Sequence, residues 1–420
     1  MTENNFPKCR LCGNPLEHTF VDLGMQPLCE SYISENQLNK MEPFYPLHTY
    51  VCDKCFLVQL EEYVCPEDIF TEYAYFSSYS DAWLQHAKNY VNMITEKLNL
   101  KGDSQVIEVA SNDGYLLQYF VEKKIPVLGI EPAANVAKVA VSKGVPTNVE
   151  FFNLKTAEKL VSEKKQADLL IGNNVLAQVP NLNEFVESMK IALKPHGVIN
   201  MEFPHLLKLI DENQFDTIYH EHFSYFSLIS VEKLFANHNL TIYHVEELST
   251  HGGSLRIYAC NSNDKSKPLD PSVKNLRDLE LSEGLSGLKK YFTFAEKVKE
   301  TKRNFLSFLI DQKGKRKSIV GYGAPGKGNT MLNYCGIRTD FIDFTVDRNP
   351  YKQGKYLPGT HIPILNPEKI RQVKPDYVLI LPWNIKEEII SQLSYISEWG
   401  GKFVVPIPEV KQFSADGTEI

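Results

Sequence analysis

The chain has 420 residues, 43% hydrophobic and 23% charged, which is typical of a globular protein and excludes a disordered or fibrous one. At roughly 150 residues per domain, this length predicts about three folding units. The net charge of −7 excludes the overall positive field that would attract nucleic acid or anionic lipid, so neither is an expected partner.

The first residues carry neither the basic nor the apolar segment of a secretory leader, and no apolar stretch approaches the ~20 residues that a membrane helix needs. We therefore expect a cytoplasmic protein with no membrane partner. Eight cysteines are too few for a disulfide scaffold. Four of them form two Cys-x-x-Cys pairs, which favours reduced thiols that bind a metal.

Residues 1–70 contain both cysteine pairs and no long helical period, so we expect a small metal-organised module there. Four thiolates in two knuckles suit tetrahedral Zn²⁺ in a closed structural site, where no position is left for water or substrate. Unrelated reduced thiols are the alternative interpretation. The predicted zinc ligands are Cys9, Cys12, Cys52 and Cys55.

Residues 71–268 are predicted to form a doubly wound α/β domain, because short apolar strands alternate with helical segments from Ser104 onward. Two later runs are joined by a turn that contains Gly252 and Gly253, and they predict an antiparallel pair that closes the sheet. The expected strands are 105–110, 126–130, 167–172 and 197–203, followed by the pair 240–247 and 254–260.

Residues 269–313 show helical spacing and many charges, which predicts a helical connector. Residues 314–420 repeat the strand-turn-helix pattern and predict a second, smaller Rossmann-like domain. Its strands are expected at 318–320, 341–346, 377–381 and 402–405.

The loop after the first strand of the middle domain indicates a nucleoside cofactor with an amino-acid tail. Glu108 can accept from an ammonium group, and Glu131, at the end of the second strand, can accept both hydroxyls of a ribose. The loop lacks the further glycines that admit a pyrophosphate, so S-adenosylmethionine fits better than NAD. A purely structural turn is the alternative. The predicted cofactor-binding residues are Glu108, Ser111, Asn112, Asp113, Gly114, Glu131, Phe152 and Asn174.

A second glycine-rich turn, residues 321–326, matches G-x-G-x-x-G, and Asp347 ends the next strand. Taken alone this pattern indicates NAD binding. Pro325, however, removes a backbone donor from the turn, and no dehydrogenase acid/base set accompanies it. Gly328 stands where a P-loop has its Ser or Thr, which argues against ATP hydrolysis.

The segment Tyr219-His220-Glu221-His222 is the densest group of acid/base side chains, and it follows a strand end where ligands bind in open α/β sheets. One imidazole oriented by a carboxylate can serve as a general base near neutral pH. A metal site and a pair of solvated or core histidines are the alternatives.

Together these motifs resemble the sugar C-methyltransferases that build branched deoxysugars, from about Cys9 to Val410. The resemblance implies an N-terminal zinc-binding domain, a central class I methyltransferase domain that binds S-adenosylmethionine, and a C-terminal Rossmann-like domain without a redox cofactor. The expected substrate is a nucleotide-linked 4-keto-deoxysugar lying between domains. The matching motifs are the two Cys-x-x-Cys pairs and residues 73–78, 111–114, 219–223, 251–254 and 321–324.

The resemblance also implies roles for the cluster. His222 is the expected base and Glu221 its orienting partner, while Tyr219 and Tyr75 bind the sugar or its enolate oxygen. Gln178 stands where the family has a histidine, and an amide can donate to an enolate oxygen but cannot shuttle a proton. The expected substrate-binding residues are His251, Ser254, Gly323 and Lys327, the last facing a diphosphate.

We therefore predict an S-adenosylmethionine-dependent C-methyltransferase that methylates a nucleotide-linked 4-keto-6-deoxyhexose at C3 through an enolate. The alternatives are an NAD-dependent nucleotide-sugar oxidoreductase and a non-catalytic zinc-bearing binding protein with a methyltransferase-like fold. The nucleotide (dTDP, GDP or CDP), the sugar substituents and the oligomeric state stay open.

Overall fold

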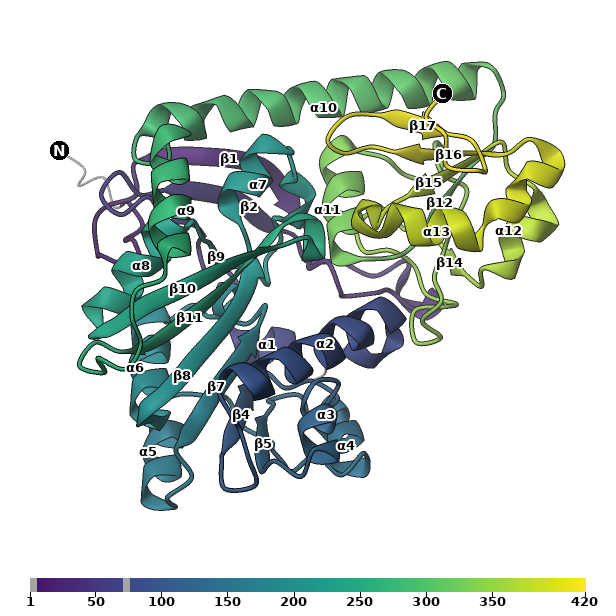
Figure 1. Cartoon of the computed structure of the whole chain (residues 1–420). Coiled ribbons are helices and arrows are strands. Elements are labelled where there is room, and N and C mark those ends of the chain that lie inside the picture. The colour runs from purple at the N-terminus through teal and green to yellow at the C-terminus, as the bar shows by residue number, and fades with distance from the viewer. Residues whose placement is uncertain (1–5, 71–75) are drawn as a thin grey trace.

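The computed structural model of the chain describes residues 6–70 and 76–420, which form three β-sheets with helices packed around them (Figure 1). Among these residues no helix is both long and apolar enough to cross a membrane. Most strands of the first sheet lie within residues 1–70, those of the second within residues 71–268 and those of the third within residues 314–420.

The first sheet is antiparallel, with the strand order β1-β2-β3-β9. Its last strand comes from far along the chain, because Ser224 and Tyr225 pair with Gln59 and Val58. The sequence did not reveal this sheet, since its outer strand is only two residues long. Its strands are β1 (His18–Gln26), β2 (Tyr45–Val51), β3 (Val58–Leu60) and β9 (Ser224–Tyr225).

The second sheet has seven strands in the order β10-β11-β8-β7-β4-β5-β6. The strands from β8 to β6 are parallel, and β11 and β10 complete the sheet as the predicted antiparallel pair. This is the doubly wound arrangement expected of a class I methyltransferase. The strands are β4 (Val106–Val109), β5 (Val127–Ile130), β6 (Thr147–Asn148), β7 (Ala167–Asn173), β8 (Leu193–Pro204), β10 (Leu240–Leu248) and β11 (Ser254–Asn261).

Helices connect and cover these strands. The helices up to β10 are α1 (Pro66–Phe70), α2 (Asp81–Lys97), α3 (Leu117–Glu122), α4 (Ala134–Ser142), α5 (Leu154–Ser162), α6 (Leu182–Ala192), α7 (Leu206–Asp211) and α8 (Leu228–Asn237). Short 3-10 turns carry site residues, namely η2 (Ser77–Tyr79), η3 (Leu176–Gln178), η4 (Phe215–Thr217) and η5 (Thr250–Gly252). Most of the site therefore lies on turns between regular elements.

The predicted helical connector consists of α9 (Pro271–Ser282) and α10 (Leu288–Gly314). Figure 1 shows α10 lying across the first and third sheets. Phe294 in α10 stacks on Phe20 of β1 with ring centroids 4.6 Å apart, and the Lys302 ammonium donates to the Tyr334 carbonyl in the third domain at 2.6 Å. The long helix thus fastens the first domain to the third.

The third sheet has the order β14-β13-β12-β15-β16-β17, parallel except for β17. The strand predicted at 341–346 is shorter than expected, because only Thr345 and Val346 pair with neighbours. The elements are β12 (Ile319–Tyr322), α11 (Gly326–Cys335), β13 (Thr345–Val346), β14 (Ile364–Leu365), α12 (Glu368–Val373), β15 (Tyr377–Ile380), α13 (Lys386–Gln392), β16 (Lys402–Val405) and β17 (Lys411–Phe413).

Candidate active site

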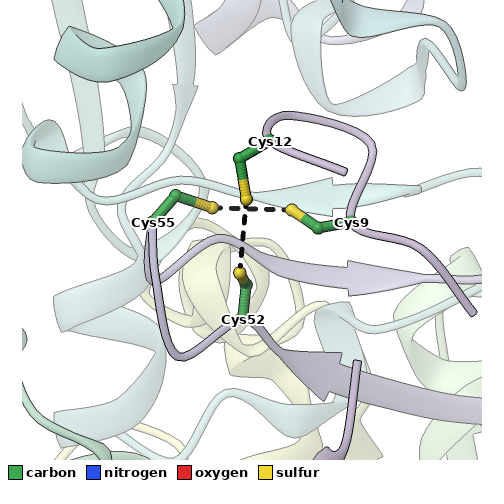
Figure 2. Close-up of side chains that lie close together, drawn as sticks. All are labelled: Cys9, Cys12, Cys52 and Cys55. Carbon is green, nitrogen blue, oxygen red and sulfur yellow. Dashed lines mark hydrogen bonds between the residues drawn. The ribbon is translucent and has the colours of Figure 1, made fainter. Parts of the chain in front are cut away.

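The four predicted zinc ligands converge on one point in the first domain (Figure 2). Their Sγ atoms all lie within 4.8 Å of one another, with 3.5 Å from Cys9 to Cys55 and 3.6 Å from Cys12 to Cys52. A tetrahedron of sulfurs about 2.3 Å from Zn²⁺ has edges of about 3.8 Å. The geometry and the donor set therefore fit a structural zinc.

The cysteine cluster is connected to the predicted catalytic turn through β3 and β9. Gln59 in β3 donates to Cys9 Sγ at 3.2 Å, and its strand pairs with β9, which begins two residues after His222. The Arg10 guanidinium, inside the first knuckle, lies 5.5 Å from the Phe223 ring. Through these contacts the folded zinc module stabilises the conformation of the turn.

The loop after β4 adopts the left-handed conformation at Ala110, Asn112 and Gly114. Gly114 is needed for packing, because a Cβ there would lie 3.0 Å from a Val145 methyl group. Asn112 instead faces a cavity, and its backbone N–H donates to Glu131 Oε2 at 2.9 Å. Among the predicted cofactor ligands in this loop, Asn112 is the one that contacts the cavity.

Glu131 and Glu108 are both buried carboxylates. Glu131 accepts from the Asn112 and Ala133 backbone N–H groups, which leaves further lone pairs for two ribose hydroxyls. Burial raises the pKa of Glu108 well above its ordinary value, and the neighbouring Glu131 adds to the rise. Glu108 lies close to Tyr115, whose hydroxyl opposes the rise of its pKa. An ammonium group nearby would satisfy Glu108.

A cavity of about 200 Å³ that opens to solvent lies beside this loop. It reaches from the cofactor loop to the predicted sugar-binding residues. The lining includes Asn112, Glu131, Phe152, Asn174, Gln178 and His251. One cavity therefore joins predicted cofactor residues to predicted substrate residues.

Ser111 and Asp113, also predicted to bind cofactor, do not line this cavity. Asp113 accepts from the Ser78 backbone N–H at 3.3 Å and from the Lys143 ammonium at 3.2 Å. Lys143 also donates to the Ser78 hydroxyl at 2.6 Å. Asp113 thus fixes the loop to η2, and its predicted direct contact with cofactor stays a prediction.

The Tyr219–His222 segment is a tight turn closed by a hydrogen bond from the His222 N–H to the Tyr219 carbonyl at 2.9 Å. The His222 ring packs on the Tyr219 ring, with centroids 4.1 Å apart, and only 7% of the residue is exposed. Its Nδ1 lies 3.0 Å from the Thr217 carbonyl oxygen. Because a carbonyl only accepts, Nδ1 carries the proton and Nε2 has the free lone pair of a base.

The two neighbours of His222 in the turn point to other elements. His220 Nε2 donates to the Pro46 carbonyl in β2 at 3.2 Å, so His220 attaches the turn to the zinc module. Glu221 accepts from Cys29 Sγ at 3.5 Å. The orienting hydrogen bond of His222 therefore comes from the Thr217 carbonyl, in place of the Glu221 carboxylate expected from the sequence.

The turn also adjoins the cavity, although His222 does not line it. The Phe223 N–H donates to the Ala177 carbonyl at 2.8 Å, which places the turn directly beside Gln178. His251, in the left-handed conformation, lies with its Nε2 3.1 Å from Asn174 Nδ2. Gln178 lines the cavity next to the Tyr219–His222 turn, and His251 lines the same cavity.

Two of the remaining predicted site residues, Ser254 and Gly323, have roles in the packing of turns. Ser254 is buried and donates to the Thr250 carbonyl at 3.0 Å, so it stabilises the turn that carries His251. Gly323 is required by packing, because a Cβ there would lie 2.6 Å from Pro382. Tyr75 lies outside the described residues.

Several site residues gave no signal in the sequence. Trp83 in α2 and Tyr115 line the cavity, and the Thr217 carbonyl fixes the ring of His222. A tryptophan on an amphipathic helix is indistinguishable from a core residue, and a backbone carbonyl has no sequence signature. These contacts depend on tertiary structure alone.

Three family models match the chain: a zinc binding domain at residues 9–70, a methyltransferase domain at 83–245 and a C-methyltransferase C-terminal domain at 249–408. The chain is also 34% identical to the C-methyltransferase NovU of Streptomyces niveus over 411 residues, which covers 98% of each chain.

Similar solved structures include magnesium protoporphyrin IX methyltransferase from Synechocystis PCC 6803, at 14% identity and a TM-score of 0.33 over 42% of this chain and 78% of that one. The PH0226 protein from Pyrococcus horikoshii OT3 matches at 14% identity and a TM-score of 0.35, over 48% and 99% of the two chains. TM-scores this low carry no argument about the function of this chain.

Proposed function

The chain belongs to the C-methyltransferase family and is an S-adenosylmethionine-dependent C-methyltransferase, and from this premise we propose that it methylates C3 of a nucleotide-linked 4-keto-6-deoxysugar. The observation that carries the acceptor proposal is the buried imidazole of His222, with its proton fixed on Nδ1, beside the cavity that Gln178 and His251 line. A neutral imidazole held in this way suits removal of a proton next to a ketone.

The chemistry follows from the acidity of that proton. A ketone acidifies the adjacent C–H, so His222 Nε2 takes the C3 proton and leaves an enolate. S-adenosylmethionine supplies the electrophilic methyl group when bound. Tyr219 and Gln178 then serve as hydrogen-bond donors to the sugar, and Glu131, Asn112 and Glu108 hold the cofactor.

The pH dependence of the reaction is expected to report His222. Burial, opposed by the hydrogen bond to Thr217, lowers the pKa of His222 to about 4, so the imidazole stays neutral well below pH 6.5. We expect kcat/KM to stay level from pH 8 to about 5 and to fall as the pH drops through about 4. An acidic limb centred near pH 6.5 would contradict this assignment.

The same measurement needs a stability control. Burial also lowers the pKa values of His220 and His251 to about 4, so below pH 6.5 these imidazoles bind more protons in the unfolded chain than in the folded one. The contribution of these histidines to the free energy of unfolding therefore decreases as the pH falls from 6.5 toward 4, while the raised pKa values of the buried Asp216 and Glu108 act in the opposite direction. Near-ultraviolet circular dichroism at each pH separates this loss from titration of the base.

Glu131→Gln is expected to weaken S-adenosylmethionine binding at least tenfold, since hydrogen bonds to a charged group contribute about 1.5–3 kcal/mol each. Calorimetric titration measures this effect, with Glu163→Gln, an exposed carboxylate at the end of α5, as the matched control. NAD is expected to bind the wild-type chain only weakly. Unchanged cofactor affinity in Glu131→Gln would contradict the ribose assignment.

The acceptor proposal is tested with a panel of dTDP-, GDP- and CDP-linked 4-keto-6-deoxysugars. Incubation with the wild-type chain and S-adenosylmethionine should raise the mass of at least one of them by one methylene unit. If the corresponding 4-hydroxy sugars are methylated equally well, the ketone is not required and the enolate chemistry is wrong.

A further inference from the structure

The glycine-rich turn between β12 and α11 lies next to two carboxylates of the chain itself, and one of them binds a backbone N–H of the turn. The Ala324 backbone N–H donates to Asp347 Oδ2 at 2.7 Å. At the start of α11, a Cβ added to Gly326 would lie 3.6 Å from Glu30 Oε1 and 2.9 Å from Cys29 Sγ. A phosphate bound at a helix N terminus is an anion, so the nearby carboxylates of Asp347 and Glu30 would repel a diphosphate at this turn.

Lys327, in the first turn of α11, contacts a different set of residues. Its Nζ donates to Asn384 Oδ1 at 2.8 Å and lies 4.7 Å from the centroid of the Trp383 ring. Trp383 in turn donates through Nε1 to Asp216 Oδ2 at 2.7 Å, and it packs so closely on Gly252 that a Cβ there would lie 2.5 Å from the ring. Lys327 therefore stands at the junction of the second and third domains.

The same junction carries the two imidazoles of the site. Gly252 follows His251 directly, and Asp216 precedes Thr217, whose carbonyl binds His222. Thr330 in α11 donates to the Ile218 carbonyl at 2.9 Å, which fixes the lysine-bearing helix against the same segment. Burial is the main cause of the low pKa values of both imidazoles, and the positive charge of Lys327 lowers them further.

Lys327 is short of acceptors for its charge. An ammonium has three N–H donors, and the one side-chain acceptor of Lys327 within the described residues is Asn384. No carboxylate of the described residues lies within ion-pair distance of it. The charge of Asp216 opposes the lowering of the Lys327 pKa by burial. The Asp216 carboxylate nevertheless accepts its hydrogen bond from Trp383 and not from Lys327. Lys327 is partly buried and burial lowers its pKa, so a ligand with a negatively charged oxygen would favour its ammonium form.

We propose that Lys327 binds the ketone oxygen of the acceptor and stabilises the negative charge that develops there, a role that rests on the proposed function. The C3–H bond breaks and its proton goes to His222 Nε2, while the electron pair moves into the carbonyl, whose oxygen becomes negative beside the ammonium. C3 then bonds to the methyl carbon as the methyl–sulfur bond breaks, and a neutral thioether leaves. A cation already in place for this charge lowers the barrier.

The test compares Lys327→Met with Lys302→Met. Lys302 is matched in environment, because its Nζ lies 4.6 Å from the Tyr334 ring centroid and donates to one oxygen, yet it sits on α10 away from the site. Three quantities are measured: kcat for methyl transfer, exchange of the C3 proton with deuterated solvent, and the Kd of the free nucleoside diphosphate of the accepted substrate.

Lys327→Met should lower kcat and proton exchange about 10²–10³-fold and leave the Kd of the nucleoside diphosphate within twofold. Lys302→Met should keep wild-type values of all three. A Kd raised tenfold or more with unchanged kcat would show that Lys327 binds the diphosphate and would overturn the proposal.

Two further results separate the remaining outcomes. If Lys327→Met loses its thermal transition, the second variant is Asn384→Ala, which keeps the lysine but removes its hydrogen bond. This variant must lower kcat while the Kd of the nucleoside diphosphate stays constant. An unchanged kcat refutes the proposal. If the wild-type chain methylates none of the 4-keto sugars, the proposed function itself fails, and this role fails with it.

Discussion

Replacing His222 with asparagine is expected to abolish methyl transfer and, with it, exchange of the C3 proton of the acceptor with deuterated solvent. A positioned general base contributes about 10²–10⁴-fold to a rate, and the other imidazole of the turn, His220, is bound to the Pro46 carbonyl. Asparagine keeps a donor that can reach the Thr217 carbonyl but has no basic nitrogen. Cofactor affinity should not change, because Glu131 and Asn112 lie on other elements.

His220→Asn is the matched control, because the same substitution is made two residues away in the same turn. His220 donates to the Pro46 carbonyl, and loss of this bond should cost about 1 kcal/mol of stability with little change in kcat. Proton exchange is followed by NMR in the absence of cofactor. Wild-type exchange in His222→Asn would show that another group, such as Tyr219 or Tyr75, is the base.

The second large effect concerns the zinc. Cys52→Ser is expected to lower the melting temperature by more than about 5 °C and to reduce methyl transfer, although the metal takes no part in the reaction. The physical reason is the pairing of β3 with β9: loss of the cysteine cluster loosens Gln59 and, through β9, the turn that holds His222. Elemental analysis should find about one zinc per wild-type chain.

Cys65→Ser is the control for this variant, because Cys65 is an exposed thiol of the same region outside the cluster. Differential scanning calorimetry and methyl-transfer assays of both variants measure the effect. A Cys52→Ser chain with the melting temperature and activity of the wild type would remove the structural role of the metal.

The sequence predicts the elements whose signal is local. Buried strands such as Val106–Val109 and Ala167–Asn173 consist mostly of apolar residues, and the turn at Gly252 indicates a hairpin directly. The four thiolates converge as expected, because their pairing in two knuckles is itself a local pattern. The position of the catalytic cluster after β8 follows from the topology of the sheet.

What could not be predicted depends on contacts between distant residues. Strand β9 has only two residues, and nothing near Ser224 indicates that its partner is Gln59. The tight turn directs Glu221 to Cys29 and His222 to Thr217, so neighbours in sequence become separate in function. The glycine-rich turn resembles a phosphate site in sequence because the carboxylates that lie next to it, Asp347 and Glu30, come from other segments.

Gln178 illustrates the same point. It lines the cavity where the family has a histidine, and its amide can donate to a sugar oxygen but cannot accept a proton at neutral pH. His222, by contrast, lies beyond the cavity wall, with a free Nε2. We infer that proton removal falls to His222 alone, while Gln178 contributes to the choice of sugar.

The most direct test of the account follows the atoms at C3. The wild-type chain is incubated with S-adenosylmethionine labelled with ¹³C in its methyl group and with an accepted 4-keto-6-deoxysugar nucleotide deuterated at C3, and the product is examined by NMR and mass spectrometry. The account predicts that the ¹³C-labelled methyl group is bonded to C3 of the product and that the deuterium is lost completely. Label on an oxygen or a nitrogen, or methylation with the C3 deuterium retained, would contradict it.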